Sequence, residues 1–222
     1  MVTDHPSPNH GPRPDGAVVD MLVLHYTGMK DARSALDRMR DPAAAVSAHY
    51  MIDEDGAVLR LVDETRRAWH AGVAAWRGHD DINDRSIGIE LVNPGHEFGY
   101  RPFPEPQMAA LIELTGEIVE RHPIPARNVV GHSDVAPTRK TDPGELFDWP
   151  RLAAAGVGLW PAAAAEGEIG RVPTTLAGYG YDTADPEAAL RAFQRHFRPA
   201  RIDGVADAQC AGLLAALLAA ID

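Results

Sequence analysis

The loop from 131 to 144 brings together three side chains that can do chemistry. It carries an imidazole on His132, an ammonium on Lys140 and a carboxylate on Asp142. If the chain is extended near the end of this loop, Lys140 and Asp142 project from the same side, because successive side chains of an extended segment alternate. Two prolines in the loop restrict its backbone. The same composition also fits a solvated surface turn, so the rest of the chain must decide between a site and a turn.

The composition is that of a globular protein with a sizeable core. The 222 residues are 45% hydrophobic, enough for one good-sized domain and a small one. The formal net charge of -11 argues against nucleic acid and anionic membrane surfaces as partners, because both reward clustered lysine and arginine. The single cysteine, Cys210, excludes an internal disulfide. Its Ala- and Leu-rich surroundings favour a buried core position over a reactive thiol.

The sequence contains no run of apolar residues long enough to span a membrane. The N-terminal residues lack both the basic and the apolar region of a secretory signal. We therefore expect a cytoplasmic protein. A protein of the periplasm or cell envelope whose signal had been removed would present the same sequence. A monomer is the expected oligomeric state.

Hydrophobic patterning predicts a mixed β-sheet flanked by helices, an α/β fold. The segments expected to form strands are 18–26, 46–53, 57–62, 84–93 and 128–132. Those expected to form helices beside them are 32–40, 106–122 and 149–155. His25, Glu90 and His132 fall at or near strand ends, and His49 lies on the first strand of a hairpin with an Asp-Gly turn. The region from 69 to 78 has little periodicity and is expected to be a long loop, which in a compact domain is usually functional.

The composition divides the chain into four parts. We expect an irregular lead-in over 1–17, the α/β domain over 18–155, a linker over 156–172 and a small helical domain over 173–222. The last part contains two apolar-periodic helices, over 185–197 and 207–221. A domain of about fifty residues is marginal for independent folding, so we expect it to dock on the first.

Residues that are distant in the sequence can meet at the ends of such strands, where ligands collect in open α/β sheets. Two imidazoles, His25 and His132, together with the carboxylate of Asp142 form a sufficient ligand set for catalytic Zn²⁺. Such a zinc site usually has three protein ligands and one position open to water. Because the three residues are far apart in the chain, their spacing alone does not establish the site.

Five motifs follow one another along the segment 18–155: Leu24–Gly28, Ser47–Tyr50, Ala68–Gly72, Asn83–Glu90 and Gly131–Gly144. In these motifs the chain resembles the zinc-dependent N-acetylmuramoyl-L-alanine amidases of the AmpD-like (type 2) family, which is related to T7 lysozyme and to peptidoglycan recognition proteins. The resemblance identifies the segment 18–155 as a zinc amidase catalytic domain. It implies zinc on His25, His132 and Asp142, with Glu90 as the catalytic acidic residue and Lys140 as the catalytic lysine.

The chemistry of amide hydrolysis is compatible with these roles. Zinc lowers the pKa of its water from 15.7 to about 7, and Glu90 can take that proton and pass it to the departing amine. Lys140 can stabilise the developing oxyanion. Gly88, on the same face of its strand as Glu90, is expected to leave room for substrate. The alternatives are an ion pair between Glu90 and Arg85 and a merely solvated Lys140.

Three further residues are candidates for substrate binding: His49, His70 and Asn93. The two histidines fit equally well as hydrogen-bonded residues of the core. The remaining histidines are assigned to surface or loop roles: His5, His10, His79, His96, His122 and His196.

The resemblance predicts hydrolysis of the amide bond between N-acetylmuramic acid, or its 1,6-anhydro form, and L-alanine. Peptidoglycan or a soluble muropeptide is then the partner. The segment 173–222 resembles a peptidoglycan-binding three-helix domain, which favours the polymer, whereas the missing signal favours soluble fragments. The alternatives are a peptidoglycan-binding or sensing protein without catalysis and a zinc enzyme that acts on another amide.

Overall fold

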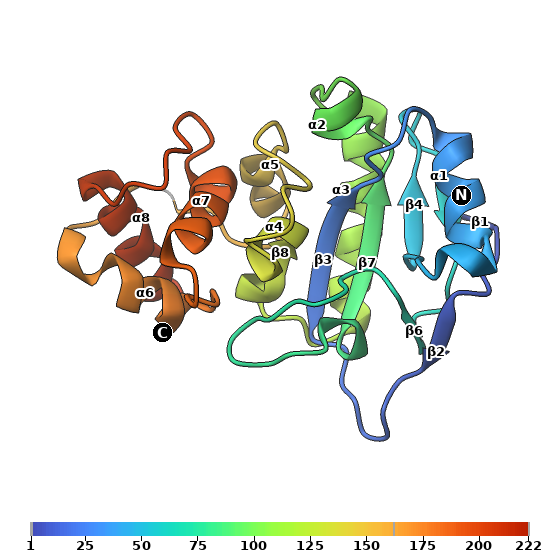
Figure 1. The fold of residues 1–222 in the computed structure, drawn as a ribbon, viewed down its shortest axis with the longest axis horizontal. Coiled ribbons are helices and arrows are strands. Elements are labelled where there is room, and N and C mark those ends of the chain that lie inside the picture. Colours follow the sequence, from blue (N-terminus) through green and yellow to red (C-terminus); the bar gives the residue numbers. More distant parts are fainter. Residues whose placement is uncertain (1, 162, 222) are drawn as a thin grey trace.

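A six-stranded mixed β-sheet forms the centre of the computed structural model, which describes residues 2–161 and 163–221 (Figure 1). Its strands, in spatial order, are β1 (Val2–Asp4), β5 (Val58–Arg60), β4 (Tyr50–Ile52), β7 (Ser86–Leu91), β3 (Met21–Tyr26) and β8 (Val129–Gly131). A separate ribbon pairs β2 (His10–Pro12) with β6 (Arg66–Ala68). The helices are α1 (Ala32–Arg40), α2 (Gly95–Phe98), α3 (Glu105–Arg121), α4 (His132–Val135), α5 (Trp149–Ala154), α6 (Val172–Tyr179), α7 (Pro186–Phe197) and α8 (Ala208–Ala219). The expected α/β architecture is confirmed.

Four neighbouring strands, β4, β7, β3 and β8, are parallel, and their register places polar residues side by side. β3 pairs with β7 on one side and with β8 on the other. Because a parallel strand is covered on both faces, β3 is an almost continuous apolar run. Its fifth residue, His25, lies opposite Glu90 of β7, and Glu90 in turn lies opposite Met51 of β4.

Side-chain alternation gives the sheet two different faces. One face packs against α3 in a single apolar core, which includes Leu22 and Leu24 of β3 and Leu111 of α3. The opposite face has two cores, one under α1 at the β4 and β5 side and one under the C-terminal helices at the β8 side. His25 and Glu90 lie on this second face, between the two cores.

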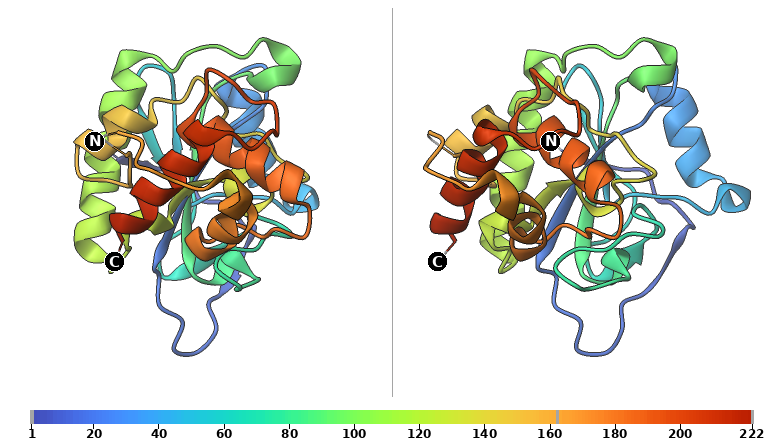
Figure 2. Two further views of the ribbon diagram at one scale, coloured as in Figure 1. Left: turned by 90° about the vertical axis from the view of Figure 1, so that its left-hand side faces the viewer. Right: turned by 60° about the vertical axis from the view of Figure 1, so that its left-hand side comes forward.

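The C-terminal helices α6, α7 and α8 dock on the first domain as expected (Figure 2). They share one hydrophobic core with Met21 and Val23 of β3 and with Val130 of β8. Asp185 and Asp207 begin α7 and α8 by accepting a hydrogen bond from a backbone N–H of the first turn. Cys210 is completely buried in this core, as predicted.

The expectation of an irregular lead-in over 1–17 is wrong. β1 adds to the edge of the main sheet beside β5, and β2 pairs with β6. Arg13 ties the segment down further by donating to the carbonyl oxygens of Glu64, Asn83 and Ser86. These strands are short and exposed, so they lack the apolar alternation that predicts a strand. Three residues of the expected segments lie outside the described residues. They are Met1 of the lead-in, Ala162 of the linker and Asp222 of the helical domain.

Among the described residues, no helix is both long enough and apolar enough to cross a membrane.

Candidate metal and catalytic site

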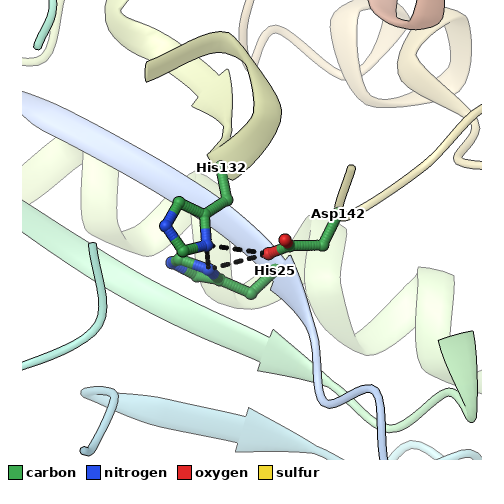
Figure 3. Close-up of side chains that lie close together, drawn as sticks. All are labelled: His25, His132 and Asp142. Carbon is green, nitrogen blue, oxygen red and sulfur yellow. Dashed lines mark hydrogen bonds and ion pairs between the residues drawn. The ribbon is translucent and has the colours of Figure 1, made fainter. Parts of the chain in front are cut away.

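Three elements bring His25, His132 and Asp142 to one point (Figure 3). His25 is near the carboxyl end of β3, His132 begins α4 directly after β8, and Asp142 follows in the loop behind α4. The backbone N–H of Ser133 donates to the carbonyl oxygen of Asp142 at 2.9 Å, which holds the loop against the helix. All three ligand residues are buried.

The three candidate ligand atoms form a nearly equilateral triangle. Nδ1 of His25 lies 2.9 Å from Nδ1 of His132 and 3.1 Å from Oδ2 of Asp142, and the third side is 3.0 Å. Ligands of a tetrahedral zinc ion at about 2.0–2.1 Å lie roughly 3.3 Å from one another. The triangle is therefore close to the spacing that a bound metal requires.

A directed chain of hydrogen bonds sets the tautomer of His25. The hydroxyl of Ser86 donates to the carbonyl oxygen of Ile82 at 2.7 Å, so its oxygen is free to accept from Nε2 of His70 at 3.1 Å. Nδ1 of His70 then accepts from Nε2 of His25 at 3.0 Å. This direction places the proton of neutral His25 on Nε2 and leaves Nδ1 bare for a metal.

His132 is set in the same way. Its Nε2 donates to the carbonyl oxygen of Ala71 at 2.9 Å, which leaves Nδ1 without a proton in the neutral ring. Burial and the adjacent His132 lower the pKa of His25 to about 4, so His25 is neutral at pH 7. Burial would raise the pKa of Asp142, but the two imidazoles outweigh it and hold that pKa well below its usual range.

Two bare nitrogens and a carboxylate oxygen that face one another at about 3 Å repel unless a cation lies between them. The donor set therefore fits a metal ion. Two imidazole nitrogens with one carboxylate suit zinc and similar transition metals, whereas Ca²⁺ and Mg²⁺ prefer oxygen ligands alone.

The carboxylate of Glu90 lies beside this triangle, next to His25 across the β3–β7 pair. Its Oε2 is enclosed and has no hydrogen-bond partner among the described residues. Burial, and after it the charge of Asp142, raise the pKa of Glu90 to about 8. The alternative ion pair with Arg85 does not form, because Arg85 pairs with Asp20 instead.

A cavity of about 420 Å³ opens in front of these residues. Glu90, His132, Lys140 and Asp142 line it, so Lys140 and Asp142 face the same space. Lys140 is partly exposed and forms no ion pair within the part of the chain that the structure describes. The remaining wall comes from α1, from the 69–78 loop and from residues around α2, including Met39, Trp69, His70 and His96.

The structure places the other predicted residues differently. His49 is completely buried behind β7, where its Nδ1 accepts from the N–H of Gly88 at 2.9 Å, so it is a core residue and does not line the cavity. Asn93 is also completely buried. It donates to the carbonyl oxygen of Arg101 and accepts from the N–H of Gly95, so its expected role in substrate binding is wrong.

His70 lines the cavity and also supports His25 from behind. Gly88 makes room for His70 and not for substrate, because a Cβ there would lie 2.4 Å from Cγ of His70. This close approach corrects the expectation for Gly88 and gives the glycine a steric reason.

Two histidines assigned to ordinary roles have specific environments. His96 lines the cavity, where its Nδ1 lies 2.9 Å from the hydroxyl of Tyr26 and its Nε2 contacts Glu145. His196 of α7 is 4% exposed and contacts Asp134. The sequence offered one signal for the position of His96, because its partner Tyr26 directly follows the predicted ligand His25. No local pattern in α7 predicted the contact of His196 with Asp134.

The known proteins that this chain resembles are amidases. Residues 15–145 match the family model described as N-acetylmuramoyl-L-alanine amidase. The N-acetylmuramoyl-L-alanine amidase AmiD of Escherichia coli (strain K12) is 40% identical over 90% of this chain and 82% of its own length. The 1,6-anhydro-N-acetylmuramyl-L-alanine amidase AmpD of Enterobacter cloacae is 37% identical over 67% of this chain and 87% of its own.

A solved structure of E. coli AmiD, in complex with the substrate anhydro-N-acetylmuramic acid-L-Ala-D-gamma-Glu-L-Lys, has the same fold. It superposes with a TM-score of 0.83 at 37% sequence identity, covering 94% of this chain and 92% of that one. The similarity therefore includes the C-terminal helices.

Proposed function

This chain belongs to the N-acetylmuramoyl-L-alanine amidase family, and we propose that it cleaves the amide bond between N-acetylmuramic acid, or its 1,6-anhydro form, and L-alanine with the help of Zn²⁺. The observation that carries the proposal is the triangle of His25, His132 and Asp142 beside the unpartnered carboxylate of Glu90. These groups meet in the wall of one cavity. The muramyl peptide bound to AmiD supports this substrate class.

The proposed metal is held by Nδ1 of His25, Nδ1 of His132 and Oδ2 of Asp142. Zinc supplies Lewis acidity there, which makes water acidic enough to attack near neutral pH and polarises the carbonyl of the amide. His70 and the carbonyl of Ala71 keep both imidazoles in the tautomer that this binding needs.

Glu90 holds and transfers the proton in the proposed mechanism. Burial raises the pKa of Glu90 above that of an exposed carboxylate, so Glu90 takes up a proton more readily than an exposed glutamate does. It first takes the proton of the attacking water and then protonates the departing nitrogen of L-alanine. Its free Oε2 is the atom that can do this without breaking a hydrogen bond within the protein.

Lys140 stabilises the negative charge that develops on the oxygen of the amide. Its ammonium reaches the cavity from the loop that also carries Asp142. The loss of one such donor costs about 2.7 to 4 kcal/mol in transition-state stabilisation. Arg139, its neighbour, donates instead to the carbonyl oxygens of Ala71 and Val73, so it anchors the 69–78 loop and is engaged there.

Product analysis tests the proposal. The zinc-loaded protein is incubated with purified sacculi and, separately, with soluble 1,6-anhydro-muropeptides, and products are identified by mass spectrometry. We expect stem peptides with a free L-alanine amino terminus, and the ratio of the two rates shows whether polymer or fragment is preferred. Muropeptides left intact by a fully zinc-loaded protein would contradict the proposal and favour action on another amide.

The same assay separates catalysis by Lys140 from a general effect of charge. Lys140→Met should lower the rate about 10²- to 10³-fold. Lys30→Met is the matched control, because Lys30 is the only other lysine and lies over the ring of Phe98, outside the cavity wall. A protein that only binds peptidoglycan would show no turnover in any of the three forms.

A further inference from the structure

A completely buried carboxylate lies two residues after the metal ligand His132. Asp134, on α4, is 1% exposed and accepts three hydrogen bonds. One comes from the backbone N–H of Gly131 at 2.7 Å, directly before His132. The other two come from the C-terminal helical region, from the hydroxyl of Tyr181 at 2.8 Å and from Nδ1 of His196 at 2.7 Å. The turn that carries His132 is therefore tied to the C-terminal helices through one side chain.

His196 is held rigidly in this position. Its ring stacks on Trp149 of α5 with 3.7 Å between centroids and on its neighbour Phe197 with 3.9 Å. Only 4% of His196 is exposed. An imidazole fixed on both faces and hydrogen-bonded at its edge leaves Asp134 little freedom to move. A buried carboxylate that lacks one of its hydrogen bonds destabilises the fold, so all three donors are needed to hold Asp134 in place.

The C-terminal helices also support the loop that holds the other side of the metal site. The N–H of Arg77 donates to the carbonyl oxygen of Gly180 at 2.8 Å, and Trp76 packs edge-on against Tyr181 with 5.1 Å between centroids. A Cβ on Gly180 would lie 2.9 Å from the Trp76 ring, so the glycine permits this contact. The same 69–78 loop supplies His70 and the carbonyl of Ala71, the hydrogen-bond partners of both ligand histidines.

We propose that Asp134, His196 and Tyr181 are positioning residues for the metal site, and that the C-terminal helices hold the His132 turn and the 69–78 loop in their metal-binding geometry. The role rests on the proposed metal-dependent function. It is separate from any contact that these helices make with glycan. Metal ligands must lie within about 0.2 Å of their ideal distances, so a small shift of α4 weakens binding. Loss of an outer partner of a metal ligand typically costs 10- to 100-fold in affinity.

The test compares three variants of the full chain. His196→Ala removes the donor to Asp134, and His196→Asn keeps an amide N–H near the position of Nδ1. Leu217→Ala is the matched control, since Leu217 is 1% exposed in the same core but has no hydrogen bond to the site. Zinc affinity is measured by chelator competition, and ligand geometry by the visible absorption spectrum of the Co²⁺-loaded protein.

We expect His196→Ala to bind zinc about 10- to 100-fold more weakly with a changed cobalt spectrum, and His196→Asn to recover most of the loss. Leu217→Ala should lower the melting temperature but keep both the affinity and the spectrum. Unchanged zinc affinity in His196→Ala, or an equal loss in Leu217→Ala, would overturn the proposal.

Amide hydrogen exchange in the metal-free proteins separates this inference from the proposed function. If the wild type itself binds no zinc, the proposed function fails, and exchange at Gly131 and His132 still decides the positioning role. Faster exchange there in His196→Ala than in Leu217→Ala supports it. Equal exchange in the two variants rejects it.

Discussion

The same strands of the central sheet present apolar core residues on one face and polar residues of the site on the other. On the α3 face, β3 and β7 present Leu22, Leu24 and Ile89 to a continuous apolar core. On the other face, one residue further along, the same strands present His25 and Glu90. Each buried Leu or Ile stabilises the fold by about 1.5 to 3 kcal/mol, whereas a buried carboxylate without a partner destabilises it. The comparison indicates that the α3 face stabilises a sheet whose second face carries the polar residues of the site between two apolar cores.

Removal of a metal ligand should have the largest effect on the functional face. His25→Ala should reduce bound zinc from about one per chain to background and abolish hydrolysis, because two ligands do not hold the ion. The affinity loss should exceed the roughly 10- to 100-fold typical of an outer partner. Zinc content and turnover are measured on the same sample. The exposed His79→Ala is the control and should match the wild type; a His25→Ala protein that keeps its zinc would reject this ligand assignment.

A core truncation on the α3 face should lower stability and leave zinc binding and turnover unchanged. Leu111 is completely buried between α3 and the sheet. Leu111→Ala should lower the free energy of unfolding by about 2 to 5 kcal/mol, measured by urea denaturation. Zinc content and turnover per folded molecule should stay unchanged. A parallel loss of turnover at a temperature where the variant is folded would show that the two faces are not independent.

An ionised carboxylate that has partners should stabilise the fold. Glu64 accepts hydrogen bonds from Tyr50, Arg121 and His122, each at 2.7 Å. Burial alone would raise the pKa of Glu64, but these donors outweigh it and lower the pKa to about 2. The stabilisation is therefore complete above the unfolded value of about 4.3 and is lost as pH falls through about 2.

The measurement is urea unfolding of wild type and Glu64→Gln at several pH values. At pH 6 the wild type should be more stable by about 1 to 3 kcal/mol, and the difference should shrink below about pH 4.3. Glu113→Gln, an exposed position on α3, should show no such difference. A gap between wild type and Glu64→Gln that is independent of pH would contradict the ion-pair explanation.

Glu90 should behave in the opposite sense. Its folded pKa of about 8 lies above the unfolded value of about 4.3, so the metal-free protein loses stability as pH rises between them. Metal-free Glu90→Gln should therefore melt above the metal-free wild type at pH 8, by about 2 to 4 °C for each kcal/mol of destabilisation removed. The difference should vanish near pH 4. Calorimetry checks this, and a Glu90→Gln protein that melts lower at pH 8 would refute the idea that Glu90 is held there at the expense of stability.

The sequence predicted the elements that carry the ligands because those elements are locally encoded. The apolar run of β3, the amphipathic pattern of α3 and the apolar periodicity of α7 predicted strand and helices at nearly their observed bounds. The ligand set came from residue chemistry and from the resemblance to a family. The structure places those atoms within 4.8 Å of one another.

The roles of the other residues depend on contacts between distant segments, which no local sequence pattern predicts. The role of Asn93 follows from a loop that folds back to Arg101, and the steric need for Gly88 follows from the position of His70. The contact of His196 with Asp134 joins residues 62 positions apart. The glycan-binding role of the C-terminal helices stays a prediction from the resemblance.

The most direct test of the central claim is the rate of peptide release by zinc-loaded Glu90→Gln. Wild type, Glu90→Gln and the control Glu97→Gln, which changes another carboxylate of the cavity wall, are assayed on one anhydro-muramyl peptide with zinc content measured in the same samples. The account predicts about one zinc in all three, a rate about 10²- to 10⁴-fold lower in Glu90→Gln, and no large change in Glu97→Gln. A Glu90→Gln protein that holds zinc and keeps the wild-type rate would contradict it.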